Sequence, residues 1–335
     1  MESHPEQPAR LLLLAGVDIP PASTIPRVVI VSPVFNEEAV LPEFLDRLEA
    51  LFAQNPAVAW GAVLVDDGSQ DRSARLIADR ASRDPRFVLI QLTRNFGFQA
   101  ALSAGLAAGP ADAVVTMDAD LQDPPEVIPR LVSAWRQGAD VVRAKRSTRA
   151  ETGLRRIAFD LFHALYGRLT DYPIPAQVGT FGLMSREALD AFNALPERHR
   201  FLPGLRAWVG FTVADVYYDR QERGAGAPKQ SFVRLVRYAM DGLFSFSYLP
   251  LRLLGMGGAA IATVGFALGV YFAVRRLVGI ETAPTGFTTL ATVVLFLGGI
   301  QLLAIGVLGE YLGRVYDEVK RRPLYIVRQH PVIRP

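Results

Sequence analysis

The sequence predicts an α/β fold, in which a mainly parallel, Rossmann-like sheet is followed by two apolar helices. Three observations carry this prediction. Short β-branched runs alternate with helical patterns up to about residue 143, acidic pairs follow two of those runs, and two long segments of the C-terminal third carry no charge. The chain has 335 residues, of which 50% are hydrophobic, so it can bury at least one large core.

The composition excludes several classes of function. The chain has 36 basic and 33 acidic residues, a net charge of +3, which does not favour a broad nucleic-acid-binding surface. The absence of cysteine excludes disulfides, thiolate metal sites and cysteine nucleophiles. The four histidines form no HExxH zinc motif. We therefore expect no nucleic-acid partner, and any metal site should use oxygen ligands.

The elements follow one another in strand–helix order. Residues 1–26 carry five prolines, so we expect a flexible tail there. Residues 28–35 form a β-branched run typical of a buried parallel strand, and residues 39–53 place apolar side chains at helical spacing. The pattern continues with a strand at 62–69, a helix at about 71–83, a strand at 87–92, a helix at about 98–108, a strand at 113–117, a helix at about 124–137 and a strand at 140–143.

Polar side chains gather where the predicted strands end. Strands that alternate with helices at this spacing form right-handed βαβ units, and ligands bind at the carboxyl ends of the strands in such sheets. The predicted ends carry Asn36-Glu37-Glu38, Asp66-Asp67, Arg94-Asn95, and Asp118 with Asp120. One edge of one sheet is therefore the candidate site.

The segment DADLQDPPE at 118–126 is the most informative part of the chain. Asp118 and Asp120 follow a buried strand, and carboxylates this close repel each other unless a cation lies between them. Oxygen ligands without cysteine favour Mg²⁺ or Mn²⁺. Together with Asp66-Asp67, this arrangement suits a nucleotide diphosphate. For Asp66-Asp67, the alternative is a turn followed by a helix N-cap, but such a turn does not require two adjacent acids.

Two segments of the C-terminal third are long enough to cross a membrane. Residues 253–274 and 287–309 are 22 and 23 residues long and carry no charge. At about 1.5 Å per residue, each helix would span about 33 Å, the thickness of a hydrocarbon core. The short loop between them predicts a hairpin. Basic residues on both outer flanks favour a cytoplasmic catalytic domain, with residues 310–335 as a cytoplasmic tail.

Two further segments have the pattern of basic amphipathic helices. Residues 154–169 and 231–252 combine an apolar face with arginines elsewhere, a design that can lie in the headgroup layer of a lipid bilayer. Ordinary helices packed on the sheet are the alternative. We expect the second segment to be a juxtamembrane helix because it directly precedes the first predicted span.

Five motifs in order carry a resemblance to a known family. They are PVFNEE (33–38), VDDGSQD (65–71), RNFG (94–97), DADLQDPPE (118–126) and RQERGAGAPK (220–229). With two spans after them, they resemble family-2 glycosyltransferases, in particular the polyprenyl-phosphate glycosyltransferases, which include bactoprenol glucosyltransferases and dolichol-phosphate mannose synthases. The resemblance covers about residues 27–325.

The resemblance implies a GT-A catalytic domain at 27–230 and an activity. Such an enzyme transfers a sugar from a nucleotide sugar to a polyprenyl phosphate, with inversion. It implies a bacterial inner-membrane protein with its catalytic domain in the cytoplasm, Mg²⁺ or Mn²⁺ as cofactor, and a homo-oligomer, expected to be a tetramer. The sugar stays open: UDP-glucose is the first expectation, and N-acetylglucosamine, galactose, a modified arabinose and GDP-mannose are alternatives.

The resemblance also implies site residues. The base and ribose would be lined by Pro33, Phe35, Glu37 and Asp66. The nucleotide would contact Asp118 and Ala119, and the metal would bind Asp120 with Gln122. The residues expected to hold the phosphates of the donor are Arg146, Arg223 and Lys229, and those expected at the lipid phosphate are Arg146, Arg155, Arg156 and Arg223. The chain departs from the family pattern at Phe35, where tyrosine is common, and at Pro228, where serine is common.

The acceptor decides whether a general base is needed. A lipid monophosphate is largely ionised at pH 7, since its second pKa is about 6, and needs no proton removed before it attacks. Asp123 is close enough in sequence to Asp120 to be a base, and a loop residue before two prolines is the alternative.

Three rival functions fit the sequence less well. A processive polysaccharide synthase carries a Gln-x-x-Arg-Trp motif, and no tryptophan here follows an arginine. A scaffold without catalysis would be expected to lose the acidic pairs, and both are intact. A dinucleotide-dependent oxidoreductase needs GxGxxG after the first strand, where this chain has PVFNEE.

Overall fold

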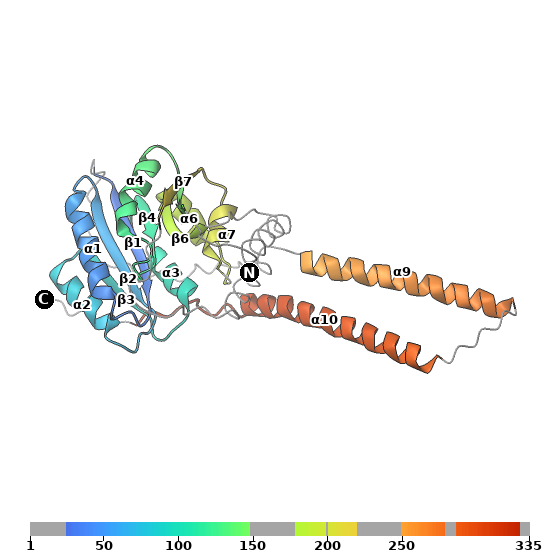
Figure 1. Cartoon of the computed structure of the whole chain (residues 1–335). Coiled ribbons are helices and arrows are strands. Elements are labelled where there is room, and N and C mark those ends of the chain that lie inside the picture. Colours follow the sequence, from blue (N-terminus) through green and yellow to red (C-terminus); the bar gives the residue numbers. More distant parts are fainter. Residues whose placement is uncertain (1–24, 148–177, 199, 220–248, 279–285, 329–335) are drawn as a thin grey trace, which may run out of the picture. The chain divides into compact units, whose positions relative to one another are not determined.

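The computed structural model describes residues 25–147, 178–198, 200–219, 249–278 and 286–328 (Figure 1). The chain divides into two compact units. The described part of the first comprises residues 25–147, 178–198, 200–219 and 323–328, and it contains the sheet. The described part of the second comprises residues 249–278 and 286–322. The predicted segment 154–169 and most of 231–252 lie outside the described residues.

The first unit is built on one seven-stranded sheet with the order β3-β2-β1-β4-β6-β5-β7. The strands are β1 (Arg27–Val34), β2 (Ala59–Asp66), β3 (Phe87–Gln91), β4 (Ala113–Thr116), β5 (Val141–Arg146), β6 (Val178–Ser185) and β7 (Val213–Tyr218). Strand β6 pairs antiparallel with both of its neighbours, and the other four pairings are parallel. The mainly parallel sheet is confirmed.

This topology brings six strand ends to one edge of the sheet. Two antiparallel pairings in succession, β4 with β6 and β6 with β5, leave β5 pointing the same way as β4. Strand β7 is parallel to β5. The carboxyl ends of β1, β2, β3, β4, β5 and β7 therefore lie at the same edge, which is where ligands bind in such folds.

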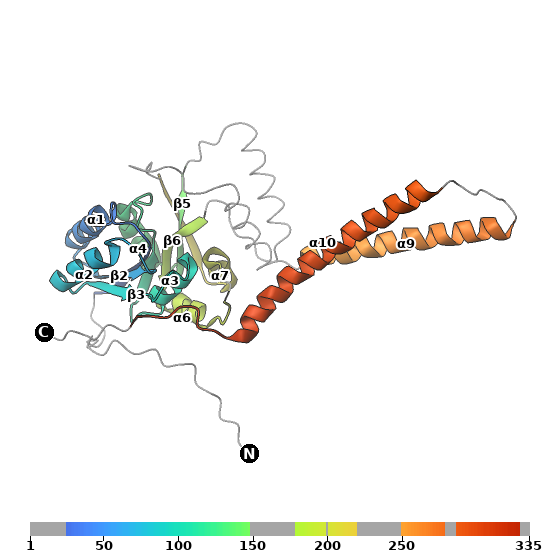
Figure 2. The ribbon, with the colours of Figure 1, turned by 90° about the horizontal axis from the view of Figure 1, so that it is seen from below.

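Helices cover both faces of the sheet (Figure 2). They are α1 (Leu41–Gln54), α2 (Ser73–Arg83), α3 (Phe98–Leu106), η1 (Pro125–Val127), α4 (Ile128–Arg136), α6 (Arg186–Ala194) and α7 (Leu202–Trp208). On one face α1, α2 and α4 pack over a continuous apolar core, to which β1 contributes Val28, Ile30 and Val34. On the other face Gly105 of α3 lies against Val31 and Val65, so the two faces follow the two-residue period of the strands.

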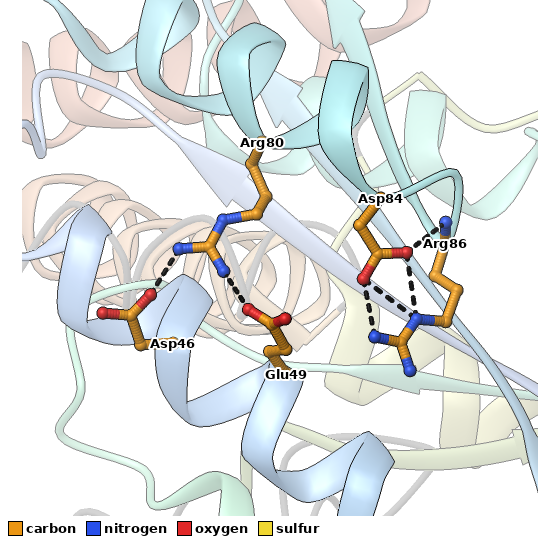
Figure 3. A network of polar contacts seen from close by, with 5 residues as sticks. All are labelled: Asp46, Glu49, Arg80, Asp84 and Arg86. Atoms are coloured by element: carbon orange, nitrogen blue, oxygen red, sulfur yellow. Dashed lines mark hydrogen bonds and ion pairs between the residues drawn. The ribbon is translucent and has the colours of Figure 1, made fainter.

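Helix α2 is held to α1 by ion pairs (Figure 3). The guanidinium of Arg80 lies between the carboxylates of Asp46 and Glu49 and bonds to both. At the end of α2, Arg86 donates to both oxygens of Asp84, with an Nη2–Oδ2 distance of 2.6 Å. These contacts lie on α1, on α2 and in the turn that leads to β3, not at the carboxyl ends of the strands, so they support the scaffold rather than the candidate site.

Several elements differ from the prediction in their bounds. The strand predicted at 140–143 extends to Arg146, and the helix predicted at 124–137 is divided into η1 and α4. No elements were predicted between about 146 and 230 apart from the amphipathic segment, yet this part supplies β6, α6, α7 and β7. The two strands give weak sequence signals because β6 and β7 are short runs that form strands only when they pair with β4 and β5.

The second unit contains two long helices, α9 (Leu249–Leu277) and α10 (Phe287–Lys320), which contact each other. Within the described residues, the stretch Phe296–Lys320 is long and apolar enough to cross a membrane, and Leu254–Leu268 is a shorter apolar stretch. Helix α10 continues well beyond the predicted end of the second span at residue 309. Large apolar side chains such as Phe266 and Phe296 are exposed along both helices, which indicates association with a membrane.

Residues 323–328 follow α10 and reach the sheet of the first unit. Arg321 has a left-handed backbone conformation that ends the helix, and Val327 then forms an antiparallel bridge with Leu92, just beyond β3. The prediction placed residues 310–335 in a cytoplasmic tail. Within this range α10 extends to Lys320, and residues 326–328 pair with the outer side of β3, because an edge strand offers unpaired backbone groups.

Candidate active site

The motifs that follow β1 and β2 are joined into one corner. The amide of Asn36 donates to Ser69 Oγ at 3.0 Å, and the amide of Gln70 donates back to Asn36 Oδ1 at 2.8 Å. The amide of Glu37 donates to Ser73 Oγ at 3.0 Å. Asn36 has a positive φ of 54°, a conformation that asparagine adopts more readily than most residues. Residues far apart in sequence thus form a single hydrogen-bonded corner at the carboxyl ends of β1 and β2.

The RNFG segment packs directly on this corner. Asp67 accepts hydrogen bonds from the amides of Phe96 at 2.7 Å and Gly97 at 2.9 Å. Gly68 has a φ of +72°, and a Cβ atom there would lie 2.5 Å from the carbonyl carbon of Arg94. Burial raises the pKa of Asp67 above its usual range, and the two amide bonds oppose that shift. Asp67 therefore acts as an anchor for the loop at 94–97.

Asp66 is completely buried at the end of β2. Its two oxygens accept from the amide of Ser69 at 3.1 Å and from Gln91 Nε2 at 3.3 Å. Asp66 thus forms the turn hydrogen bond that the alternative interpretation of Asp66-Asp67 expects. Contact of Asp66 with a nucleotide would require local movement. By contrast, Phe35 is 41% exposed and Pro33 is half-buried at the end of β1, while Glu37 is half-buried in the loop that follows.

The acidic pair after β4 lies at the same edge. Asp118 and Asp120 are half-buried, and Ala119 between them is buried. Asp120 Oδ1 accepts from the amide of Gln122 at 3.1 Å. Leu121 has a positive φ of 57°, which is unusual for a leucine and turns the chain sharply at this point.

The donor set after β4 fits a divalent cation that is shared with a substrate. Among the described residues, no group of three or more His, Cys, Asp or Glu side chains could hold an ion alone. Mg²⁺ is usually bound by one or two carboxylates together with substrate phosphates and water. Two neighbouring carboxylates and one amide side chain, all oxygen donors, match that requirement better than a site made of protein alone.

Asp123 lies in a buried network that sequence reasoning did not find. The hydroxyl of Tyr218 donates to Asp123 Oδ1 at 2.6 Å, and Arg146 Nη2 lies 3.9 Å from the same oxygen. Asp123 and Tyr218 are 3% and 4% exposed. A hidden carboxylate held by a phenol and near a guanidinium is poorly placed to take a proton from a substrate, so this geometry favours a positioning role for Asp123 over that of a general base.

The same network fixes Arg146 beside the acidic pair. Burial lowers the pKa of Arg146, but the hydrogen bond to Tyr218 and the charges of Asp123 and Asp118 raise it overall. Burial, together with the negative charge of Asp123, raises the pKa of Tyr218 far above its usual range. Arg146 is therefore a permanent cation and Tyr218 a permanent donor. Tyr218 could have been found from its place just before the RQER motif, had β7 been predicted.

Four of the expected phosphate contacts lie outside the described residues: Arg155, Arg156, Arg223 and Lys229. Other expected residues lie at the carboxyl ends of β1, β2, β4 and β5, or directly after them, and so at the same end of the sheet. They include Phe35, Asp66, Asp118, Asp120 and Arg146. This arrangement defines the class of the fold. The fold is a nucleotide-binding α/β fold with two carboxylates and an arginine at the ligand-binding edge.

Comparison with known proteins identifies the family. The model of glycosyl transferase family 2 matches residues 29–192, and that of the GtrB C-terminal hairpin matches residues 249–315. The SfII prophage-derived bactoprenol glucosyl transferase of Shigella flexneri is 41% identical over 304 residues, which cover 90% of this chain and 98% of that protein. The prophage bactoprenol glucosyl transferase homolog of Escherichia coli K12 is 40% identical over 90% of this chain and 99% of that protein.

A further relative is the glycosyltransferase sll0501 of Synechocystis, with 41% identity over 89% of this chain and 93% of that protein. The chain belongs to glycosyl transferase family 2, in the branch that carries the GtrB C-terminal hairpin. It is a glycosyltransferase with a GT-A fold, as the motifs at 33–38, 65–71 and 118–126 predicted.

Proposed function

We propose that this protein transfers a sugar, with inversion, from a nucleotide sugar to a polyprenyl phosphate. The bactoprenol glucosyl transferases among its relatives support the acceptor and make UDP-glucose the first donor to test. The observation that carries the proposal is that the acidic pair after β4 and the half-buried cation Arg146 at the end of β5 lie at the same end of the sheet.

The nucleophile is the phosphate oxygen of the lipid. It arrives already ionised, so the protein has to orient it and offset its repulsion from the donor diphosphate. A planar guanidinium can bind phosphate oxygens through two parallel hydrogen bonds. The Tyr218–Asp123 pair holds Arg146 in place for this task, and Arg155, Arg156, Arg223 and Lys229 are proposed to complete the phosphate contacts. No residue is required to remove a proton.

The donor is proposed to lie along the ends of β1, β2 and β4. Phe35 offers an exposed ring for the base, with Pro33, Glu37 and Asp66 around it, and Asp118 and Ala119 contact the nucleotide. Asp120 and Gln122 would hold Mg²⁺ or Mn²⁺, which supplies positive charge next to the leaving diphosphate when it is bound. Attack from the side opposite the diphosphate inverts the anomeric carbon.

The hairpin is proposed to anchor the enzyme in the bacterial inner membrane, where the acceptor dissolves. Both helices would cross the bilayer, which leaves the catalytic unit on the cytoplasmic side together with the nucleotide sugars. The segments 154–169 and 231–252 are proposed to lie at the membrane surface. We also propose a homo-oligomer, with a tetramer as the expected state.

A radiolabel transfer assay tests the proposal. The purified full chain receives undecaprenyl phosphate, Mg²⁺ or Mn²⁺ and one labelled nucleotide sugar at a time, and the product is extracted into organic solvent. Label in the organic phase with UDP-glucose, dependent on both metal and lipid, is the expected result. Transfer from another donor alone would change the sugar, and no transfer from any donor would refute the polyprenyl phosphate acceptor.

A further inference from the structure

Residues 323–328, called the C-terminal strap from here on, follow α10 and lie along the outer edge of β3. The amide of Thr93 donates to the carbonyl of Ile326 at 2.9 Å, and the amide of Arg328 donates to the carbonyl of Gln91 at 2.7 Å. These bonds flank the bridge between Leu92 and Val327. The dark red segment in Figure 2 reaches the sheet at this edge.

One side chain of the strap, Tyr325, is partly shielded from solvent. Tyr325 is half-buried, and Arg200, which precedes α7, is close enough for its charge to affect it. Burial raises the pKa of Tyr325, and the charge of Arg200 opposes that rise. Arg200 is itself fixed, because its Nη2 donates to the carbonyl of Phe192 at 2.6 Å and its guanidinium lies over the Phe192 ring. The strap is thus held by backbone pairing, and its Tyr325 side chain is half-buried.

The strap contacts the residues that hold the two acids after β2. Gln91, whose carbonyl accepts from the strap, donates through its side chain to Asp66. Thr93, whose amide donates to the strap, directly precedes the loop at 94–97, and the amides of that loop hold Asp67. Asp66 is therefore linked to the strap through one residue, Gln91, and Asp67 through one loop, residues 94–97.

The strap pairs with β3, which is an edge strand of the sheet. Without the strap, the carbonyl of Gln91 and the amide of Thr93 would face solvent at an open strand edge. The loop at 94–97 would then keep its contacts with Asp67 and Gly68 and its link to the start of α3, but it would lose the pairing on its outer side. Loops with few buried contacts and exposed backbone groups open at low free energy, so pairing on the outer side should keep this one closed.

We propose that the C-terminal strap is a positioning element for the nucleotide half of the active site. This inference rests on the proposed function, because it assumes that the corner formed by residues 35–37, 66–69 and 94–97 binds the donor nucleotide. The strap begins three residues after the end of α10 at Lys320, so one short stretch of chain connects the apolar helix to the residues that hold Asp66 and Asp67.

The test compares two substitutions at one position. Arg328→Pro removes the amide that donates to Gln91, and Arg328→Ala keeps it while removing the same side chain. Binding of UDP, and separately of GDP, with Mg²⁺ is measured by calorimetry on the purified full chain. We expect Arg328→Pro to weaken nucleotide binding about threefold to tenfold, as one or two lost hydrogen bonds would, and Arg328→Ala to bind as the wild type does.

Hydrogen exchange gives a readout that does not depend on the nucleotide. Amides at 93–97 should exchange faster in Arg328→Pro than in Arg328→Ala. A chain that ends at Arg322 removes the whole strap and should show the same two effects at least as strongly, which keeps the test open if the proline variant does not fold. Folding is checked by the thermal unfolding of each variant.

The outcomes separate the two proposals. A wild-type chain that binds neither UDP nor GDP would refute the proposed nucleotide site and, with it, this inference. A wild-type chain that binds, with Arg328→Pro and the truncated chain binding equally well, would overturn the inference alone. Faster exchange at 93–97 without weaker binding would also overturn it, because the strap would then pair with the edge without positioning the site.

Discussion

At the residue scale, charge and burial separate the carboxylates of the candidate site into two groups. Asp66, Asp67 and Asp123 are buried, and each accepts hydrogen bonds from other groups of the protein. Asp118 and Asp120 are half-buried at the open edge. The second group is therefore the one suited to contact a donor or a metal, and the first group suits the shaping of the site.

Asp120 tests the metal proposal. Asp120→Asn keeps an oxygen that can accept from the Gln122 amide but removes the negative charge, so folding should be retained. We expect sugar transfer to fall by about a hundredfold or more, the scale seen when one preorganised electrostatic contact is lost. Transfer is measured across Mg²⁺ and Mn²⁺ concentrations and in excess chelator. Full wild-type activity in chelator would contradict the metal proposal.

Tyr218 tests the buried network. Tyr218→Phe removes the hydroxyl that donates to Asp123 and leaves a buried carboxylate with one donor fewer. We expect a loss of about 1–3 kcal/mol in stability, together with slower transfer because Arg146 loses a neighbour that holds it. Tyr217→Phe is the matched control, since Tyr217 is adjacent but 55% exposed. Equal thermal unfolding of the two variants would show that the hydroxyl contributes nothing.

At the element scale, the site exists because loops interlock at the ends of strands. The turn after β2 packs on the RNFG loop so closely that only a hydrogen atom fits at Gly68. The loop after β1 is tied to the start of α2. On the other side, β5 and β7 bring Arg146 and Tyr218 to the acid-bearing loop after β4. Each contact joins segments that are distant in the sequence.

Gly68→Ala tests the close contact between the two loops. Its Cβ would lie 2.5 Å from the Arg94 carbonyl carbon, so one loop has to move. Gly109→Ala is the control, because Gly109 also has a positive φ but has open space around it. Both should pay the backbone cost of about 1–3 kcal/mol, and Gly68→Ala alone should also lose nucleotide binding. Equal binding by both variants would show that the loop contact is not needed.

The pairing of β5 with β7 predicts a pH dependence. Burial opposes ionisation of Asp215, but bonds from Arg143 at 2.7 Å and Lys145 at 2.5 Å lower its pKa below its usual range overall. A lowered pKa stabilises the fold above the pKa of the unfolded chain, near 3.9, and this contribution disappears as the pH falls through the folded value.

Asp215→Asn should therefore be less stable than the wild type at pH 7, by about 1–3 kcal/mol, and the difference should shrink below about pH 4. Thermal unfolding at pH 7, 5 and 3.5 measures it. Asp79→Asn makes the same change of charge on an exposed helix face and should show no such trend. A difference that stays constant down to pH 3.5 would contradict the assigned ion pairs.

At the scale of the whole molecule, two kinds of surface occur in one chain. The first unit buries its apolar residues in the sheet core, whereas α9 and α10 leave many large apolar side chains exposed. Exposure on this scale is stable only against lipid or other protein, as the GtrB hairpin match also indicates. The C-terminal strap then returns the chain to the first unit.

The absence of cysteine in the natural chain permits a direct test of membrane orientation. Gln54→Cys places one thiol on the exposed end of α1, and Thr282→Cys places one between α9 and α10 in the sequence. With intact bacteria and a membrane-impermeant maleimide, Thr282→Cys should react at once and Gln54→Cys only after permeabilisation. The reverse pattern would place the catalytic unit outside, and reaction of neither thiol before permeabilisation would argue against a hairpin that crosses the membrane.

Much of the fold could be predicted because its signals are local. The βα alternation from β1 to β5 follows from apolar runs that are short and β-branched or spaced at helical intervals. The strands β6 and β7 were missed, since Val178–Ser185 and Val213–Tyr218 become strands through pairing with distant partners. The same holds for the C-terminal strap, which has no pattern of its own and pairs because the β3 edge is open.

The sequence by itself determined the family, the hairpin and the carboxylates that lie at the sheet edge, since motifs and hydrophobic periodicity depend on residues close together in the chain. Only the tertiary structure decided which carboxylates are buried and which partners they have. It assigned Asp67 to the RNFG loop, paired Asp123 with Tyr218, and placed the C-terminal strap beside Gln91 and Thr93. Distant segments form hydrogen bonds and bury each other's side chains only when the sheet assembles, so no local sequence pattern predicts these contacts.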